Sequence, residues 1–283
     1  MKKGLLITVN YNNWFYTESF IKTLISFGDK SIKIVIVDNS PKTTDNSISN
    51  LVSENENVVY LKTKKNIGYF GAVNYAIKVV DNNKYDYIII CNNDITIENL
   101  NFFEILNEKL ELYDIIAPSI KTKENIQQNP HREKKIDFKR KILYKIYFSS
   151  YLIAKLINYI VRKKRIKQKE YNECEREIAS PHGAFIILNK TFFSKGGFID
   201  DGFFLYGEED TIMAQAQKLK LKIGFVPDLK VKHFESLSTG KSFTKKKFLI
   251  QRDAHKYVQN KYKLYKIINS KETHDSAKAQ KRM

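Results

Sequence analysis

Apolar runs and helix-like segments alternate along the first hundred residues, and this pattern predicts strands and helices in turn. Ile32 to Val37 is rich in β-branched residues, as expected for a strand covered on both faces. In Thr17 to Phe27 the apolar residues recur at the spacing of one helix face. Strands are expected at Leu5–Val9, Ile32–Val37, Val58–Leu61 and Tyr85–Ile90, and helices at Thr17–Phe27 and Gly71–Val80. This order favours an α/β fold with a mainly parallel central sheet flanked by helices.

Small polar residues and glycines follow each of the predicted strands. In parallel sheets, ligands bind beyond the edge at which the carboxyl ends of the strands meet. One such residue alone is ordinary turn chemistry, because Asn, Asp and Gly favour turns and helix caps. Four groups at one edge instead predict a ligand site. The groups are Asn10, Tyr11 and Asn12; Asp38, Asn39 and Ser40; Asn66, Gly68 and Gly71; and Asn92, Asn93 and Asp94.

Three consecutive carboxylates, Glu208, Glu209 and Asp210, follow a segment rich in aromatic residues and bounded by glycines. They open a helix expected at Thr211 to Lys220, where the helix dipole favours negative charge. Capping explains one or two of them, whereas three together suggest a carboxylate placed to take a proton. From this stretch alone, two interpretations of the carboxylates stay open: a catalytic role and an acidic start of a helix.

The segment from Lys139 to Lys169 differs from the rest of the chain. Isoleucines recur near helical spacing between Ile142 and Ile160, with lysines and the cluster Arg162 to Arg165 around them. This predicts a basic amphipathic helix, or a pair of helices, suited to lie in a membrane interface. A helix packed on the domain with its basic face solvated is the alternative. The tail from Ser270 is polar, and we expect it to be frayed or disordered.

The formal net charge of +18 over 283 residues implies attraction to polyanions such as nucleic acid, anionic lipid or phosphorylated substrates. A solvated basic surface is the plain alternative. Cys91 and Cys174 form neither a disulfide framework nor a metal-binding pattern, which fits a reducing cytosol. The first apolar run is too short for a signal-peptide core. No segment reaches the roughly 20 apolar residues of a membrane-spanning helix.

Taken in order, the motifs of this chain resemble those of the family 2 glycosyltransferases, inverting enzymes with the GT-A fold. The similarity covers roughly residues 4 to 240 and points to the rhamnosyltransferase-like bacterial branch. It implies a GT-A domain at 1–240 with the basic helical insertion at 139–169, and a basic helical extension at 241–283. The motifs are Val9–Asn12, Val37–Ser40, Asn66–Asn74, Cys91–Ile95, Gly183–Leu188, Gly196–Asp200, Phe204–Asp210 and His233–Ser238.

The resemblance assigns contacts to a nucleotide-sugar donor, which presents a base, a ribose and two phosphates. Asp38 is expected at the base or ribose, with Tyr11 and Asn12 beside the base. The loop before the second predicted helix is expected to let backbone approach the ligand closely. The implied donor-binding set is Asn10, Tyr11, Asn12, Asp38, Asn66, Gly68, Gly71, Asn74, Asn92 and Asn93.

The resemblance also implies a divalent metal, Mn²⁺ or Mg²⁺. The run from Asn92 to Asp94 corresponds to the family's Asp-x-Asp motif, with Asn in place of the first acid. A cation bound by oxygen ligands and a diphosphate needs few protein carboxylates. Asp94 is therefore the expected main ligand. His233 aligns with a histidine that approaches the metal or phosphates in relatives, and a structural, hydrogen-bonded histidine is the alternative.

Inversion requires a general base that takes the proton of the acceptor hydroxyl. The family pattern is Tyr-x-Glu-Asp, with Asp as the base, and this chain reads Tyr206-Gly-Glu-Glu-Asp. An alignment of the two patterns without a gap places Glu209 at the position of the base. Asp210 stays open as the alternative base, and Glu208 is expected in a supporting role.

The expected reaction is transfer of a hexosyl or deoxyhexosyl group to a cell-surface glycan or lipid-linked acceptor. The expected partners include an anionic membrane surface and no specific nucleic acid, a homodimer is left open, and the location is the cytoplasmic face of the membrane. A nucleotidyltransferase is a rival, although no glycine-rich basic loop follows the first strand. A basic nucleic-acid- or membrane-binding protein without catalysis is a second rival, but it leaves the polar residues at the strand ends unexplained.

Overall fold

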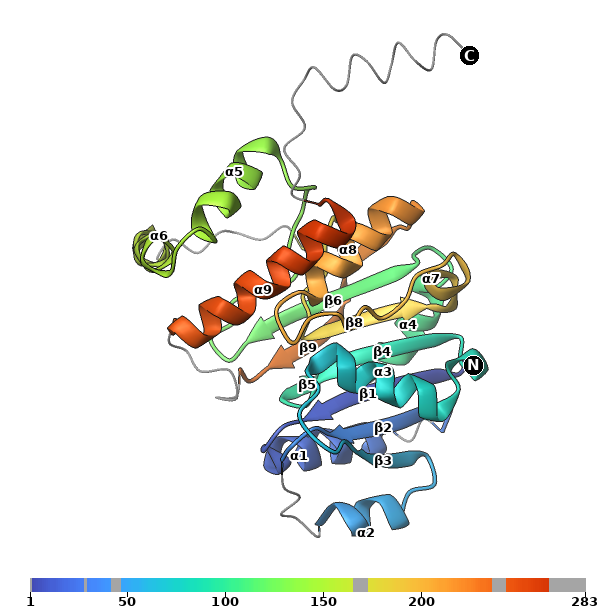
Figure 1. The fold of residues 1–283 in the computed structure, drawn as a ribbon. Coiled ribbons are helices and arrows are strands. Elements are labelled where there is room, and N and C mark those ends of the chain that lie inside the picture. Colours follow the sequence, from blue (N-terminus) through green and yellow to red (C-terminus); the bar gives the residue numbers. More distant parts are fainter. Residues whose placement is uncertain (1, 28–29, 42–46, 165–172, 236–242, 265–283) are drawn as a thin grey trace.

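The computed structural model describes residues 2–27, 30–41, 47–164, 173–235 and 243–264, which build an α/β fold around one curled sheet (Figure 1). The strands are β1 (Gly4–Asn10), β2 (Ile32–Asp38), β3 (Val58–Lys62), β4 (Tyr87–Asn92), β5 (Ile95–Ile97), β6 (Ile115–Thr122), β7 (Arg176–Glu177), β8 (Phe185–Asn189) and β9 (Ile223–His233). The helices are α1 (Trp14–Ser26), α2 (Ser47–Ser53), α3 (Tyr69–Val80), α4 (Phe102–Lys109), α5 (Phe138–Tyr147), α6 (Tyr151–Lys164), α7 (Lys190–Ser194), α8 (Glu208–Leu219) and α9 (Lys245–Tyr262), with a 3-10 turn at Asn82–Lys84.

The sheet contains nine strands in the order β3-β2-β1-β4-β8-β6-β9-β5, with β7 paired to β9. Strands β1, β2, β3, β4, β6 and β9 run in one direction, and β5, β7 and β8 run against them. The predicted mainly parallel sheet with helical flanks is confirmed. Asn10 is in register with Asp38, and Val9 with Asn92. Three predicted site residues therefore meet at one edge.

Two apolar clusters, one on each face of the sheet, hold the helices against the strands. Successive side chains of a strand point to opposite faces. Leu6 accordingly belongs to one cluster, while Leu5 and Ile7 belong to the other, and all three are fully buried. Phe20 of α1 joins the first cluster and Phe70 of α3 the second. The sheet core fixes the strand ends that carry the candidate site.

Helix α1 and strand β4 begin at residues other than those predicted. In each case a buried side chain or a hydrogen bond sets the boundary. Helix α1 begins at Trp14, three residues before the predicted Thr17, since the Trp14 indole is buried in the core. Strand β4 begins at Tyr87 rather than Tyr85. The residue between them, Asp86, accepts a hydrogen bond from the Lys3 amide at 2.9 Å through its side chain.

Two helix starts near the candidate site also differ from the prediction. Helix α3 begins at Tyr69, so Gly71 lies inside its first turn rather than in a loop. Helix α8 begins at Glu208, three residues before the predicted start, because the helical hydrogen bonds already involve the Gly207 carbonyl. The three carboxylates therefore form the first turn of α8 itself.

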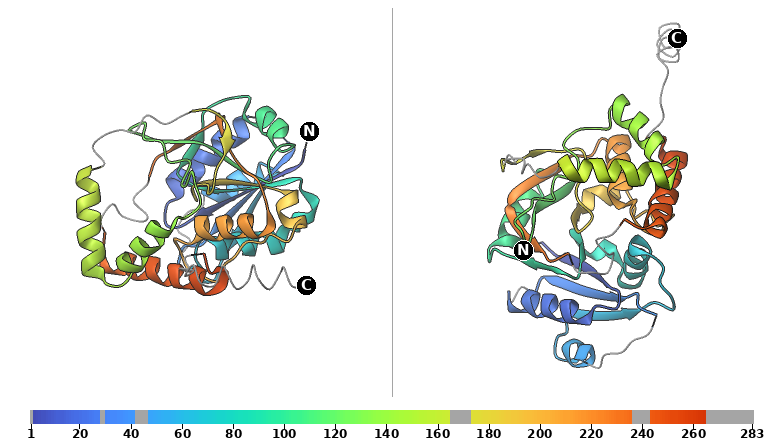
Figure 2. Two further views of the ribbon diagram at one scale, coloured as in Figure 1. Left: turned by 90° about the horizontal axis from the view of Figure 1, so that it is seen from above. Right: turned by 90° about the vertical axis from the view of Figure 1, so that its left-hand side faces the viewer.

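The basic segment forms a pair of helices, α5 and α6, that packs beside α9 (Figure 2). Residues 165–169 of the predicted segment and the polar tail 270–283 lie outside the described residues. Within the described ranges, no helix combines the length and apolar character needed to cross a membrane.

A buried aspartate fixes α9 to the loop before α8. Asp200 is 2% exposed, and its carboxylate accepts hydrogen bonds from Tyr257 and Tyr262 at 2.6 Å each. The Lys261 ammonium lies 3.0 Å away. Burial works to raise the pKa of Asp200, but these three donors outweigh it and leave the pKa below its usual range. A lowered native pKa contributes stability above the unfolded pKa, and this is lost as the pH falls through the native value.

We expect Asp200→Asn to lower the free energy of unfolding at neutral pH by on the order of 2 kcal/mol, since the donors lose a charged acceptor. The difference from the wild type should shrink as the pH falls below about 4, the unfolded aspartate pKa. Urea unfolding at a series of pH values measures this. A difference that stays constant with pH would assign the effect to side-chain shape instead of charge.

Candidate active site

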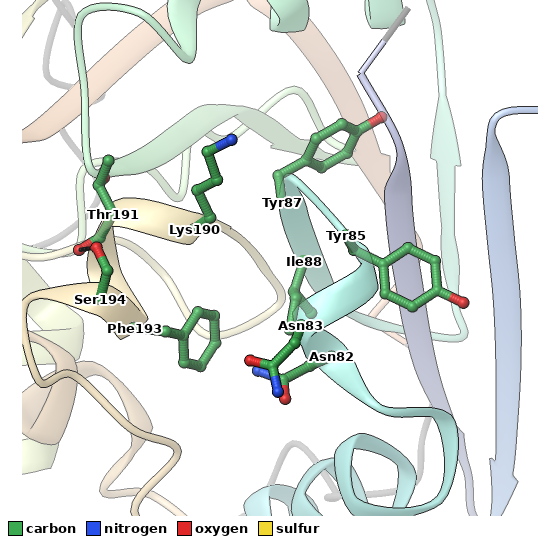
Figure 3. A pocket seen from close by; sticks show the side chains of 9 residues that line it. All are labelled: Asn82, Asn83, Tyr85, Tyr87, Ile88, Lys190, Thr191, Phe193 and Ser194. Carbon is green, nitrogen blue, oxygen red and sulfur yellow. Dashed lines mark hydrogen bonds between the residues drawn. The ribbon is translucent and has the colours of Figure 1, made fainter.

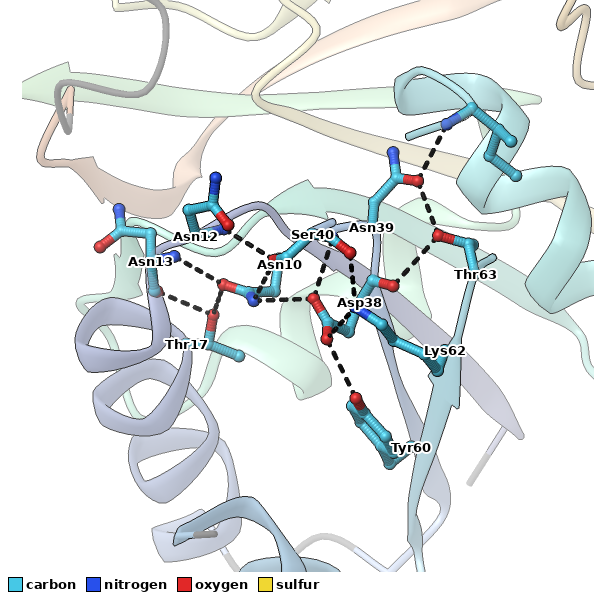
Figure 4. Close-up of polar contacts among 11 residues, drawn as sticks. Asn10, Asn12, Asn13, Thr17, Asp38, Asn39, Ser40, Tyr60, Lys62 and Thr63 are labelled. Carbon is cyan, nitrogen blue, oxygen red and sulfur yellow. Dashed lines mark hydrogen bonds and ion pairs between the residues drawn. The ribbon is translucent and has the colours of Figure 1, made fainter. Parts of the chain in front are cut away.

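Polar side chains at the ends of β1, β2 and β3 form one hydrogen-bond network (Figure 4). The Asp38 carboxylate is fully buried at its centre. Its Oδ1 accepts from the Asn10 side-chain amide at 3.2 Å and from the Ser40 backbone N–H at 3.0 Å. Its Oδ2 accepts from the Tyr60 hydroxyl at 3.0 Å and from the Lys62 ammonium at 2.7 Å. Both carboxylate oxygens are therefore occupied by protein donors.

The Asp38 carboxylate is kept ionised by these donors. Burial works to raise its pKa, and hydrogen bonds from Lys62, Ser40 and Tyr60 outweigh it, so the pKa lies below the usual range. The Lys62 side chain is 31% exposed. A nucleotide that contacts Asp38 has to displace that ammonium, and the predicted contact stays a prediction.

Asn10 connects this network to Asn93 in the interior. Asn10 Oδ1 accepts from the Thr17 hydroxyl at 3.0 Å and from the Asn93 side-chain amide at 3.3 Å. Asn93 Nδ2 is also 2.7 Å from Thr17 Oγ1. Both asparagines are buried, so their side chains join β1, α1 and β4. This geometry favours a positioning role for them. Tyr11 and Asn12 are exposed at the same edge, and their donor contact stays a prediction.

A second network joins the end of β2 to the loop before α3. The Asn39 side chain donates to Asn66 Oδ1 at 2.9 Å and to the Gly68 carbonyl at 3.0 Å. Asn39 Oδ1 accepts from the Ile67 amide at 3.0 Å. The predicted donor-binding list omitted Asn39. Its position directly after Asp38, in a run of polar residues at the end of a strand, is the feature of the sequence that indicates a role for Asn39.

Gly68 is the residue of this loop that requires glycine. Its φ is +83°, and an added Cβ would lie 2.3 Å from the Phe204 carbonyl oxygen. Gly71 differs, because its added Cβ would meet only the Ile67 side chain at 3.4 Å. The expected approach of a ligand to the backbone at Gly71 stays a prediction. Asn74 donates to the Ile199 carbonyl at 2.8 Å and holds the loop that leads to α8.

Asn92, Asp94 and His233 meet between the end of β4 and the start of β5, which pairs with the end of β9 at Ile95 and His233. His233 Nε2 lies 3.3 Å from Asp94 Oδ1 and 3.3 Å from Asn92 Nδ2. His233 Nδ1 lies 2.7 Å from the Gln128 side-chain oxygen, an acceptor. Because the Gln128 oxygen is an acceptor, Nδ1 donates this hydrogen bond, and Nε2 is the ring nitrogen that faces Asp94.

This corner fits a divalent cation as a two-ligand site. A carboxylate oxygen and an imidazole nitrogen, both suited to Mn²⁺, face one another at 3.3 Å. Among the described residues, no group of three or more His, Cys, Asp or Glu side chains could hold a metal ion. Any ion bound here therefore needs further ligands from the donor and from water.

The two glutamates of α8 are in different protonation states. Glu208 is 6% exposed, and burial together with the neighbouring Glu209 raises its pKa to about 8. For Glu209, burial works to raise the pKa, while the His131 imidazole and the Gly183 N–H work against it and leave it below the usual range. The Gly183 amide donates to Glu209 Oε1 at 3.0 Å. At neutral pH Glu208 is neutral and Glu209 is a carboxylate.

Asp210 is engaged in a different contact. Its Oδ1 lies 3.3 Å from Nη2 of Arg132, a residue that is 8% exposed. The guanidinium of Arg132 also lies over the Tyr144 ring of α5, 5.3 Å from the ring centroid. Arg132 therefore ties the first turn of α8 to the helical pair. The pattern of the sequence contained no signal for this residue.

Aromatic residues link the acidic turn to the metal corner. The His182 and His233 rings lie 6.3 Å apart, and burial lowers the pKa of His182 to about 4, so its imidazole is neutral. Burial first, and then acidic neighbours that include Glu208 and Asp94, raise the pKa of the Tyr69 phenol. The base candidates and the metal corner thus lie on two sides of one small region. Neither His182 nor Tyr69 was predicted as a site residue.

Comparison with known proteins decides the family. Residues 5–197, more than half of the chain, match the family described as glycosyl transferase family 2. The chain belongs to this family. One relative of this family 2 chain is the low-salt glycan biosynthesis hexosyltransferase Agl10 of Haloferax volcanii, 24% identical over 221 residues. The match covers 77% of this chain and 63% of that protein, so the chain spans less than two thirds of its relative.

Solved structures similar to this family 2 chain share its GT-A fold. GalNAc-T7 with UDP, GalNAc and Mn²⁺ gives a TM-score of 0.62 at 13% identity, over 92% of this chain and 48% of that one. The mannosyltransferase PcManGT from Pyrobaculum calidifontis, in complex with GDP-Man and Mn²⁺, gives 0.51 at 12% identity, over 93% and 72%. S. aureus TarS gives 0.51 at 13% identity, over 83% and 37%.

A surface pocket of about 380 Å³ lies at the other end of β4, away from the site (Figure 3). Tyr87 and Ile88 at the start of β4 line it, whereas Asn92 of the candidate site ends that strand. No residue predicted from the sequence as functional belongs to its lining. Its other lining residues are Asn82, Asn83, Tyr85, Lys190, Thr191, Phe193 and Ser194.

Two glycines of the family 2 chain offer a matched test of this geometry. Gly68→Ala should lower the free energy of unfolding by more than about 1 kcal/mol, because φ is positive and the new Cβ meets backbone. Gly71→Ala should be neutral or stabilising by roughly 0.5–1 kcal/mol, since alanine favours a helix interior. Thermal unfolding of both variants measures this. Equal effects would mean that Gly68 is not in contact with the Phe204 loop.

Proposed function

We propose that this chain is an inverting glycosyltransferase that transfers a sugar from a nucleotide-sugar donor to an acceptor hydroxyl. The observation that carries the proposal is the pairing of an ionised Glu209 with a neutral Glu208 beside the Asp94–His233 corner. A carboxylate that can take a proton thus lies near residues that fit a cation. The nucleotides and Mn²⁺ named with GalNAc-T7 and PcManGT support a nucleotide-sugar donor and a divalent metal.

In the proposed reaction Glu209 accepts the proton of the acceptor hydroxyl while that oxygen attacks the anomeric carbon. The bond between the anomeric carbon and the diphosphate oxygen breaks, and the nucleoside diphosphate leaves with the electron pair. Asp94 and His233 would hold a divalent cation, which supplies positive charge for the leaving diphosphate. The Gly183 N–H orients Glu209 through its bond to Oε1.

Glu209 is favoured over Asp210 as the base by the contacts of each carboxylate. Asp210 Oδ1 is already engaged by the Arg132 guanidinium at 3.3 Å, so an acceptor hydroxyl would have to compete with that ion pair. Glu209 has a backbone N–H on one oxygen and imidazoles nearby. Glu208, which keeps its proton at neutral pH, supports the turn and does not compete for the acceptor proton.

We assign the exposed residues at the sheet edge to the donor and the carboxylate turn to the acceptor. Tyr11 and Asn12 contact the nucleotide, with Asn66 beside the phosphates. The transferred group is a hexosyl or deoxyhexosyl residue, as in the rhamnosyltransferase-like branch; the hexosyltransferase Agl10 supports the hexosyl reading. The acceptor is a cell-surface glycan or a lipid-linked saccharide, and the protein acts at the cytoplasmic face of the membrane.

Replacing the base tests the chemistry directly. Glu209→Gln keeps the size and the hydrogen bond to Gly183 but removes the proton acceptor, so turnover should fall by roughly 10²–10⁴-fold. Donor affinity should be unchanged, because Glu209 contacts the acceptor. Release of nucleoside diphosphate, together with thermal shift by a panel of nucleotide sugars, measures both quantities.

Asp210→Asn is the matched control for Glu209→Gln and should have the smaller effect on turnover. Glu208→Gln should also cost less than Glu209→Gln, since Glu208 is already neutral. Loss of turnover in Asp210→Asn with near-normal Glu209→Gln would move the base by one residue. Normal turnover in all three variants would refute the inverting mechanism.

The metal corner makes a separate prediction. Transfer should require a divalent cation and should fall sharply in Asp94→Asn, because the amide cannot balance the charge of the diphosphate. Donor binding titrated with and without Mn²⁺ gives a readout independent of turnover, and the metal should strengthen it only in the wild type. Full activity in the presence of a chelator would remove the metal from the proposal.

A further inference from the structure

The α5–α6 pair, residues 138–164, exposes an unusual amount of apolar side chain. Leu152 is 73% exposed and Leu156 is 60% exposed. A surface helix of a globular protein turns its apolar stripe toward the core. The apolar side chains of this pair that are exposed are Phe138, Ile142, Leu143, Ile146, Leu152, Ile153, Leu156, Tyr159, Ile160 and Val161. We call this set the hairpin face.

Three of the most exposed apolar residues of α6 lie on one side of the helix. Leu152, Leu156 and Tyr159 are spaced by four and three residues, so their side chains neighbour one another on the helix surface. Ala154, on a different side, is fully buried. In Figure 2 α6 lies at the margin of the molecule, and no described element covers its outer side. The helix is thus amphipathic with its apolar side outward.

The inner side of the pair is held by a separate set of aromatic residues. The Phe148 ring stacks on His255 of α9 at 4.3 Å, and the Tyr151 and Phe248 rings lie 5.8 Å apart. The Asn158 side chain donates to the Tyr147 hydroxyl at 2.9 Å. Because these residues fill the inner contact, the exposed leucines and isoleucines of the hairpin face lie outside it.

Within α5 and α6 themselves the charged residues are of one sign. Lys139, Lys141, Lys145 and Lys155 belong to the same two helices, and the sequence from Phe138 to Lys169 contains no Asp or Glu. A second copy of a chain with net charge +18 would bring these lysines against like charge. Nucleic acid would attract the lysines through its phosphates, but it provides no apolar environment in which the leucines could be buried. An anionic lipid bilayer matches both features.

We infer that the hairpin face docks on an anionic lipid bilayer, with its leucines and isoleucines among the acyl chains and its lysines at the headgroups. This inference deepens the membrane location given in the proposed function and rests on it in that respect, but docking does not depend on whether transfer occurs. It names a surface and a partner for a segment that the site chemistry does not use.

Docking would also orient the site. In Figure 1 the arrows of β1, β6 and β9 point toward the side of the molecule on which α6 lies. The Arg132 guanidinium spans from Tyr144 of α5 to Asp210 of α8. The acidic turn is therefore linked by direct contacts to the docking helices, and a lipid-linked acceptor would reach it from the bilayer side.

Vesicle flotation tests this inference with the full chain. The wild type should float with phosphatidylcholine vesicles that contain phosphatidylglycerol, and binding should weaken as salt shortens the Debye length from ~30 Å at 0.01 M to ~8 Å at 0.15 M. The double variant Leu152→Ser with Leu156→Ser should bind roughly tenfold or more weakly. Lys145→Gln with Lys155→Gln should cost about fivefold per lysine.

Matched controls separate the hairpin face from general effects. Leu100→Ser changes a leucine that is 89% exposed outside the pair and should bind as the wild type does. Lys78→Gln with Lys218→Gln removes the same charge elsewhere and should cost less than the hairpin pair. Thermal unfolding of each variant confirms that it is folded.

Three outcomes would overturn the inference. They are equal binding by the leucine double variant and the wild type, equal binding of neutral and anionic vesicles, and absence of vesicle binding. If the protein bound no vesicles and instead formed a dimer that the leucine double variant abolished, the hairpin face would be assigned to contact with a second copy of the chain. Glu209→Gln should float normally, so lost transfer with intact docking would refute only the proposed chemistry.

Discussion

The ionised carboxylate of Asp38, buried at the carboxyl end of β2, is the constraint on which the sheet edge depends. An unpaired buried charge is costly, so the chain has to bring donors to it. These come from β1 through Asn10, from β3 through Tyr60 and Lys62, and from the following loop through Ser40. Satisfying one carboxylate therefore sets the relative positions of three strand ends and leaves Tyr11 and Asn12 facing outward.

The three carboxyl groups at the start of α8 differ in protonation and in contacts because their surroundings differ, not because of their residue type. Glu208 is enclosed and keeps its proton, Glu209 meets an N–H donor and imidazoles, and Asp210 meets a guanidinium. Adjacent positions of one helical turn point in different directions, about 100° apart. Each carboxyl group consequently has its own partners. This separation lets one turn hold a neutral acid, a base candidate and a structural ion pair.

The sequence predicted the fold and the edge of the sheet well, because both follow from local periodicity. The runs Ile32–Val37 and Leu5–Val9 contain their own strand signal, and strand direction then places their polar ends together. Side-chain direction was not predictable in the same way. Asn10 and Asn93 turn inward because Thr17, distant in sequence, offers a partner. Arg132 and His182 lie in segments without periodicity, so only the tertiary structure brings them to the acidic turn.

The site and the hairpin face depart from ordinary burial in opposite senses. Asp38 and Glu208 are polar residues removed from water, and Leu152 and Leu156 are apolar residues left in it. Either arrangement alone lowers folding stability, because desolvated carboxyl groups and exposed leucines are both unfavourable. A ligand or surface that binds the folded state offsets such a cost only where it makes contact. The two departures lie in separate elements, so we assign them to two different partners: the proposed nucleotide-sugar donor at the sheet edge and the proposed anionic bilayer at α5 and α6.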